Sequence, residues 1–232
     1  MVLPVLVLGA LSSAGSCLLR ELLFRKQPVI ALVTDPGRVP ADLWASPLLT
    51  LVQGEITNEE ALAKAMGPCL AVFSLLSPSF RTRKLDPSHY SDIYRDHIFP
   101  TMRKYGIRRI IAIGNICIAR PNDQDTLMPR VLRGSLKLLA RSMYQNTQNL
   151  ARTFEEEGDE LKWTLARVSL VPTELEEEEW KISRDEELYE GNLGDKGWGF
   201  ITPTAAMTKW MVDNIWGSQW ISEMPALSAH VH

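Results

Sequence analysis

Short apolar runs alternate with stretches of helical period through the first two thirds of the chain. The runs predict strands and the amphipathic stretches predict helices, an alternation typical of an α/β fold: a doubly wound parallel sheet with helices on both faces. The predicted strands span residues 3–8, 28–33, 48–52, 70–76, 108–113 and 162–168. The predicted helices span residues 14–25, 58–66, 88–105 and 134–157.

Polar and glycine residues mark the predicted helix ends. Gly67, Gly106 and Gly158 each follow a predicted helix, where glycine is the preferred residue. The second helix is predicted to start near Thr57, because residues 58–60 supply a polar cap and carboxylates that suit the positive end of the helix dipole.

Residues 172–200 form a more polar segment. A run of glutamates precedes Trp180, and a glycine-rich stretch carries Trp198, so this segment predicts a surface loop or lid over the substrate rather than a strand. A last helix is predicted over residues 204–216, with Trp210 and Trp216 on its apolar side.

The composition favours a single domain over residues 1–232. With 45% hydrophobic residues, the chain can bury one well-filled core. Its formal net charge of -3 offers no basic face for phosphates, so we expect no nucleic-acid partner. No segment has the roughly 18 apolar residues of a membrane span, so no membrane partner is expected. Cys17, Cys69 and Cys117 lie in apolar stretches without metal-ligand spacing, which indicates a reducing, cytoplasmic location.

A glycine turn joins the first predicted strand to the first predicted helix. In the G-x-x-G-x-x-G form of this turn, Gly9 lets the chain reverse and Gly15 lets the helix pack on the strand. Ser12 stands where the second glycine would let the backbone approach a pyrophosphate. The serine adds bulk there, although its hydroxyl could also donate to a phosphate.

Five motifs in this order resemble the NmrA-like, NAD(P)H-binding branch of the atypical short-chain dehydrogenase/reductases, which includes small flavin and biliverdin reductases. They are the turn 9–15, Ala-Leu-Val-Thr-Asp-Pro at 31–36, Gln-Gly-Glu-Ile-Thr at 53–57, residues 104–111, and Trp-Thr-Leu-Ala-Arg at 163–167. The resemblance implies a Rossmann-like fold with NADP or NAD as cofactor, unless the altered turn has lost it.

The resemblance also implies where a nucleotide would bind. Members that use NADP carry an arginine after the second strand, where this chain has Thr34. Arg38 could reach a 2'-phosphate, Asp35 could accept from a 2'-hydroxyl, or residues 35–37 could simply form a turn. The cofactor-binding candidates are Gly9, Leu11, Ser12, Ser13, Ala14, Gly15, Thr34, Asp35, Arg38, Glu55, Ile56, Leu76 and Ser77.

The Tyr-x-x-x-Lys pair of the wider superfamily is missing. Its positions fall near Met143 and Thr147, which argues against ordinary ketone reduction. The candidates for catalysis are Asn115, whose amide could hold a carbonyl oxygen or brace its own loop, and Tyr144 and Gln148, one helical turn apart.

Four aromatic residues are candidates for substrate contact. Phe80 follows the fourth predicted strand, and Trp180, Tyr189 and Trp198 lie in the predicted lid, where exposed aromatic rings would cover an apolar substrate. Histidines 89 and 97 have no accompanying ligand cluster, so no metal is expected.

Three functions follow from these observations. The first is NAD(P)H-dependent reduction of a hydrophobic enone or quinone-like small molecule, in specialised metabolism. The second is a cofactor-independent, redox-neutral step such as cyclisation or isomerisation in the same crevice. The third is a non-catalytic regulator that senses nucleotide, although a pure sensor would not need an aromatic lid.

Overall fold

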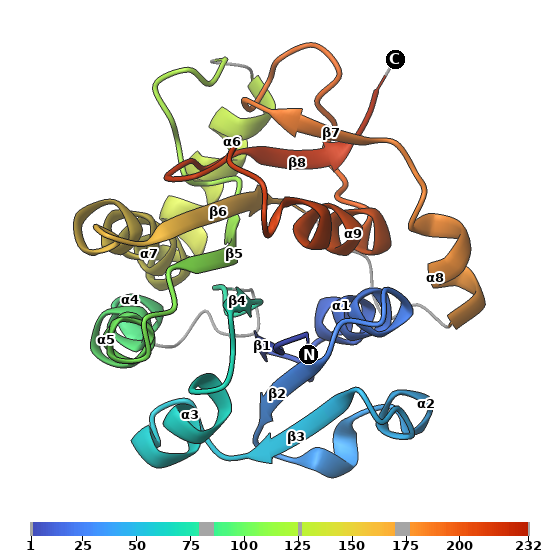
Figure 1. The fold of residues 1–232 in the computed structure, drawn as a ribbon. Coiled ribbons are helices and arrows are strands. Elements are labelled where there is room, and N and C mark those ends of the chain that lie inside the picture. Colours follow the sequence, from blue (N-terminus) through green and yellow to red (C-terminus); the bar gives the residue numbers. More distant parts are fainter. Residues whose placement is uncertain (1, 79–85, 125–126, 170–176, 232) are drawn as a thin grey trace.

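A computed structural model describes residues 2–78, 86–124, 127–169 and 177–231. In this part of the chain, eight strands form one sheet in the order β3-β2-β1-β4-β5-β6-β8-β7, parallel except for β7, which runs antiparallel to β8 (Figure 1). The strands are β1 (Val5–Leu8), β2 (Val29–Val33), β3 (Leu49–Gln53), β4 (Ala71–Ser74), β5 (Arg109–Asn115), β6 (Lys162–Val168), β7 (Leu188–Gly191) and β8 (Ala226–Ala229).

Helices cover both faces of the sheet (Figure 1). One face carries α3, α4, α5 and α7, and the other carries α1 and α9. The helices are α1 (Ser13–Phe24), α2 (Ala41–Trp44), α3 (Glu59–Met66), α4 (His89–Asp92), α5 (Phe99–Lys104), α6 (Leu127–Leu139), α7 (Arg141–Glu157), α8 (Glu177–Ser183) and α9 (Thr204–Asn214). The predicted doubly wound fold is confirmed.

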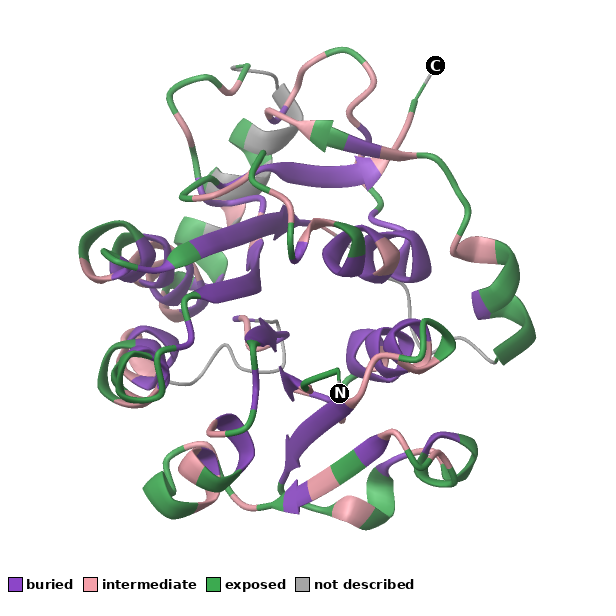
Figure 2. Cartoon of the chain, viewed as in Figure 1, coloured by how far each residue is buried: buried purple, intermediate pink, exposed green. Residues whose placement is uncertain are grey.

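The alternation of side chains along β1 divides the interior into two cores. Leu6 and Leu8 face one core, and Val5 and Val7 face the other, as the period of two in a strand requires. Both sets are buried, as Figure 2 shows for the centre of the sheet. Strands buried on both faces explain why the sequence shows apolar runs there rather than polar alternation.

Two predicted helices are interrupted. Over residues 88–105, a π-helical segment (Ile93–Ile98) separates α4 from α5, and the Phe99 N–H donates to the Tyr94 carbonyl five residues earlier. Pro100 causes this, since it has no N–H and its ring would clash with the carbonyl one regular turn before it. The single helix predicted over 134–157 is wrong, because Ala140, at φ -140° and ψ 54°, divides α6 from α7.

The polar cap predicted before α3 is present. Asn58 caps α3, and its Oδ1 accepts from the Ala61 N–H at 3.0 Å. Gly67 and Gly158 directly follow α3 and α7, and Gly106 has φ +69°.

The C-terminal part is more regular than predicted. Residues 177–200 include α8 and β7, so the expectation of a segment without strands is wrong, while residues 172–176 lie outside the described part. The predicted last helix is confirmed as α9, with Trp210 buried. Trp216 follows it and is 61% exposed, so its predicted place on the apolar side is wrong.

Arg109 in β5 holds the end of α9 against the sheet. Its guanidinium donates to the carbonyls of Asn214 and Ile215 at 2.9 and 2.8 Å and to that of Lys162 at 2.7 Å. Burial lowers the pKa of Arg109 to about 10, which leaves it charged at neutral pH. A charged donor thus satisfies the last carbonyls of a helix, where cations are favoured.

Arg167 in β6 forms a second buried arginine site. Its two terminal nitrogens donate to the Asp123 carboxylate at 2.6 and 2.9 Å, and the two side chains are 1% and 6% exposed. Arg167 also donates to the carbonyls of Met224 and Ile118, while Asp123 accepts from the Leu193 N–H at 3.0 Å. This buried pair therefore connects four segments of the chain.

We predict that Asp123→Asn lowers the free energy of unfolding by about 3–5 kcal/mol, because it leaves the buried Arg167 charge without its partner. Urea denaturation followed by fluorescence measures this. Glu177→Gln is the matched control, since it removes an ion pair with Lys181 in which both side chains are more than half exposed, and it should cost less than about 1 kcal/mol.

The pH dependence of the free energy of unfolding is a second test of the same ion pair. Burial raises the pKa of Asp123, but the hydrogen bonds and charge of Arg167 outweigh it, and the net shift is downward from 3.8. Stability from this pair is therefore present above about pH 4 and lost as the pH falls further. The difference between wild type and Asp123→Asn should shrink in that range, and a constant difference would contradict the assignment.

Candidate functional site

The order of the strands places the expected ligand crevice at the carboxyl ends of β1 and β4. Strand order reverses between these two, and ligands of open α/β sheets bind at such a point. Gly9 follows β1 with φ +81°, and a Cβ there would lie 3.2 Å from the Leu75 backbone after β4. The two loops therefore touch, and Gly9 supplies both the backbone conformation and the space that this contact requires.

Ser12 fits the glycine turn without strain. Its φ of -84° is open to any residue, so the position does not need glycine for its conformation. Its hydroxyl donates to the Gly9 carbonyl at 2.8 Å and accepts from the Gly15 N–H at 3.0 Å, which caps α1. The serine side chain is thus held by the turn itself. To donate to a phosphate, its hydroxyl would have to give up the hydrogen bond to the Gly9 carbonyl.

Gly15 is the most constrained position of the turn. A Cβ there would lie 2.5 Å from the carbonyl oxygens of Gly9 and Ala10. The close packing of α1 on the turn therefore depends on glycine, as predicted.

The start of α1 fits the pyrophosphate of a dinucleotide. The N–H groups of Ser13 and Ala14 belong to a first helical turn, which has no acceptors within the helix. There is no acidic residue in this turn to repel an anion. Backbone donors together with the helix dipole favour negative charge at this place.

The loop after β2 is a turn that leaves Arg38 exposed. Asp35 accepts from the Gly37 N–H at 3.0 Å and begins a 3-10 helix (Pro36–Arg38), so the predicted turn is present. Thr34 is exposed, and its carbonyl accepts from the Gln53 side chain. One carboxylate oxygen of Asp35 is thus committed to the turn, which favours Arg38 as the group that meets a ribose phosphate.

The loops after β3 and β4 complete the crevice. Glu55 is exposed, and Ile56 is half-buried against the core of α3. Beyond β4, the Leu76 carbonyl accepts from the Tyr94 hydroxyl at 3.2 Å, and that hydroxyl lies 2.6 Å from Ser74 Oγ. Burial raises the pKa of Tyr94, so this tyrosine stays neutral and fixes the end of β4. The sequence analysis missed its role, because only the fold brings it to Ser74.

Three predicted catalytic residues meet around the turn after β5. Asn115 Oδ1 accepts from the Cys117 N–H at 2.8 Å, and Gln148 Nε2 donates to the Cys117 carbonyl at 3.0 Å. Tyr144 is half-buried and packs against the cluster of Cys117 and Met143. The structure therefore brings Asn115, Tyr144 and Gln148 together, with the bracing role of Asn115 present.

The helix α7 offers no superfamily acid at the usual positions. Met143 is 2% exposed, and Thr147 is 1% exposed with its hydroxyl donating to the Met143 carbonyl at 2.9 Å. Both side chains are committed to the interior, whereas Tyr144 on the same helix is only half-buried.

The aromatic lid residues separate in the structure. Trp180 is 2% exposed and packs on Cys17 and Phe24 of α1, where Arg184, the residue after α8, also binds buried Glu21. The prediction of an exposed ring that covers substrate is therefore wrong for Trp180, because long-range packing buries it.

Tyr189 is also buried, and its hydroxyl donates to the Asn192 carbonyl at 2.8 Å, so its predicted exposure is wrong as well. Trp198 is half-buried and packs on the cluster that contains Ile116, next to Asn115. Phe80 lies outside the described residues.

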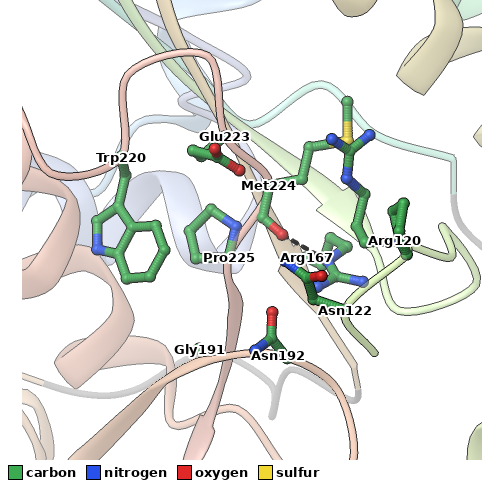
Figure 3. A pocket seen from close by; sticks show the side chains of 10 residues that line it. Arg120, Asn122, Arg167, Gly191, Asn192, Trp220, Glu223, Met224 and Pro225 are labelled. Carbon is green, nitrogen blue, oxygen red and sulfur yellow. Dashed lines mark hydrogen bonds between the residues drawn. The ribbon is translucent and has the colours of Figure 1, made fainter. Parts of the chain in front are cut away.

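A cavity of about 310 Å³ lies beside the strands β6, β8 and β7 (Figure 3). Its lining includes Arg167, Asn192, Trp220, Glu223 and Met224, from β6 and the segments beside β7 and β8. β4 and β5 lie between β1 and β6 in the sheet, and no residue of the glycine turn lines this cavity. It is separate from the crevice, and Arg167 within it is committed to Asp123.

Two searches of the described residues gave nothing. No group of three or more His, Cys, Asp and Glu side chains among them could hold a metal ion. None of their helices combines the length and apolarity needed to cross a bilayer.

The fold is similar to those of solved dehydrogenase/reductase, oxidoreductase and Rossmann-fold proteins. A short-chain dehydrogenase/reductase from Veillonella parvula in complex with NADP has 16% identity and a TM-score of 0.72, with 100% of this chain and 98% of that chain covered. An oxidoreductase from Lactococcus lactis has 11% identity and a TM-score of 0.72, covering 97% and 90%. A Rossmann-fold NAD(P)-binding family protein from Shigella flexneri has 16% identity and a TM-score of 0.66, covering 99% and 94%.

A search of curated proteins gave no match. Residues 9–194, however, match the family model described as NAD(P)H-binding. The matched range begins at the glycine turn, directly after β1, and includes β2 to β7, so it contains the loops that follow the parallel strands and the turn around Cys117. The predicted Rossmann-like fold and nicotinamide-dinucleotide cofactor agree with this match, and the chain belongs to the NAD(P)H-binding family.

Proposed function

We propose that this chain is an NAD(P)H-dependent oxidoreductase that reduces a hydrophobic enone or quinone-like small molecule. The observation that carries the proposal is the turn between β1 and α1. Gly9 and Gly15 keep the required conformation and close packing, and Ser12 replaces a glycine without strain while its side chain is held by the turn. The backbone donors of α1 are therefore arranged for a pyrophosphate.

Residues of the loops around the crevice would hold the nucleotide. The N–H groups of Ser13 and Ala14 suit the pyrophosphate, and Arg38 suits a ribose phosphate. The ends of β3 and β4, at Ile56 and Leu76, would flank the base and the ribose. When bound, a reduced nicotinamide supplies a hydride to the substrate.

The turn around Cys117 would orient the substrate oxygen. Because Asn115 Oδ1 accepts from the Cys117 N–H, the amide nitrogen of Asn115 is directed away from that bond and is a fixed donor. Tyr144 packs against Cys117 of the same turn, and its hydroxyl would donate a hydrogen bond or a proton to a developing oxyanion. Gln148 holds the Cys117 carbonyl and so positions the turn.

The chemistry of the substrate follows from what α7 lacks. With Met143 and Thr147 buried at the superfamily positions, no lysine lowers the pKa of a neighbouring tyrosine. A conjugated enone or quinone delocalises the negative charge of its reduced form and therefore needs less proton donation than an isolated ketone. Trp198, packed beside Ile116, supplies an apolar surface for such a ring.

The burial of Met143 and Thr147, which leaves α7 without a tyrosine-lysine pair, also favours a second candidate function. A redox-neutral cyclisation or isomerisation would need hydrogen-bond donors such as Asn115 and Tyr144 but neither a nucleotide nor the tyrosine-lysine pair. This candidate predicts an intact crevice without nucleotide affinity.

We predict that Gly15→Ala weakens NADPH binding by at least about tenfold, because the new Cβ would push α1 away from the turn. Titration of tryptophan fluorescence in the purified chain measures this. Gly134→Ala is the matched control, because a Cβ at this exposed position meets nothing within 4 Å, and it should leave affinity unchanged. Absence of binding to the wild-type protein at millimolar NADPH and NADH would overturn the proposal and favour the redox-neutral function.

The choice of cofactor should depend on Arg38. We predict that Arg38→Ala weakens NADPH binding by about tenfold or more and leaves NADH binding nearly unchanged, because charged hydrogen bonds to a phosphate are lost. Arg108→Ala is the control. Arg108 is also exposed, but it precedes β5 and so lies at the amino-terminal ends of the strands, away from the proposed nucleotide site. Equal loss for both nucleotides would show that Arg38 does not read the 2'-phosphate.

Turnover should depend on the donors near Cys117. On a panel of quinones and enones with NADPH, we predict that Asn115→Ala and Tyr144→Phe each lower kcat by about 100-fold, with smaller changes in KM. Tyr105→Phe, at a 40% exposed position beyond α5, should have no effect. Nucleotide binding without turnover on any member of the panel would favour a regulator instead.

A further inference from the structure

The helix α6 exposes a row of apolar side chains. Val131, Leu138 and Leu139 are 57%, 84% and 85% exposed. Val131 and Leu138 are seven residues apart, which places them on the same face, and Leu139 lies about 100° around the helix from Leu138. Exposed leucines gathered on one helix face mark an interaction surface. Figure 2 shows exposed residues on α6 in green.

Basic side chains lie beside this row. Arg130 and Lys137 are exposed, are also seven residues apart, and stand about 100° from Val131 and Leu138 on the side opposite to Leu139. Residues 127–139 of α6 contain three arginines and lysines and no aspartate or glutamate, whereas the whole chain has a formal charge of -3. The local charge is therefore strongly positive in an acidic protein.

This combination selects the partner. In a symmetric dimer through α6, the basic rows of both copies would meet and repel each other, so charge disfavours a second copy of this chain. An anionic lipid bilayer has negatively charged headgroups above an apolar layer, so it can bind the basic row and the apolar row at the same time. Basic residues at the edge of an apolar face are typical of helices that lie in the interface of an anionic membrane.

We propose that α6 is a membrane-surface helix, which inserts Val131, Leu138 and Leu139 among the headgroups of a bilayer containing anionic phospholipids. At 13 residues, α6 is about 20 Å long, too short to span and suited to lie in the plane of the interface. The break at Ala140 separates its direction from that of α7. The inference does not rest on the proposed enzymatic function.

The test is flotation of the purified full chain, without nucleotide, with two kinds of vesicle. One kind contains phosphatidylcholine alone, and the other also contains phosphatidylserine. We expect binding only to the anionic vesicles and a decrease with added salt. Leu138→Gln with Leu139→Gln should reduce binding to the level of neutral vesicles, and Lys137→Glu should reduce it about fivefold or more.

Two matched variants control for the chemistry of the substitutions. Ile182→Gln removes an apolar side chain that is 78% exposed on α8, and Lys64→Glu reverses a charge on α3. Both should bind like wild type, and thermal denaturation should confirm that every variant is folded.

Absence of binding by wild type, or equal binding to neutral vesicles, would overturn the proposal. So would equal losses in the controls. Dissociation of a wild-type dimer by the double leucine variant, without vesicle binding, would assign the row to a second copy instead. Capture of acidic proteins without vesicle binding would assign it to a protein partner.

Discussion

The ion pair of Arg167 and Asp123 fixes the carboxyl edge of the sheet. It is buried, and its two members also hold the backbone at Ile118, Leu193 and Met224. Each of these contacts belongs to a different segment. The positions of the loop after β5, the loop after β7 and the residues before β8 therefore all depend on one charge pair. Loss of either partner would leave a buried charge, which costs more than the pair contributes to stability.

This constraint extends to the candidate catalytic turn. The loop that starts at Asn115 is held first at Cys117, by Asn115 and Gln148, and then at Asp123. A donor on a loop fixed at both ends loses little freedom when it binds a substrate oxygen, which is the condition for electrostatic stabilisation of a transition state. The same loop leads into α6, so the catalytic turn and the proposed membrane contact lie on one continuous stretch of chain.

Local patterns predicted the parts that local physics decides. The central strands β1, β2, β4 and β5 were predictable because their residues are buried on both faces, and Gly15 was predictable because its helix touches the turn. The fit of Ser12 depends on a backbone angle that residue type does not reveal. Trp180 lies beside four glutamates in sequence and so suggested exposure, but Cys17, far away along the chain, covers it. Alanine is a good helix former, so the residue type at Ala140 does not predict the break between α6 and α7.

The position of β8 between β6 and β7 has a consequence for synthesis. β7 pairs with β8 in the described sheet, yet it precedes β8 by more than thirty residues, so it emerges from the ribosome before its partner exists. Until residues 226–229 are translated, β6 is an open edge with apolar side chains on both faces, the kind of strand that recruits other chains. The nascent protein is therefore most prone to aggregation during that interval, and a chaperone that shields β6 would have its greatest effect there.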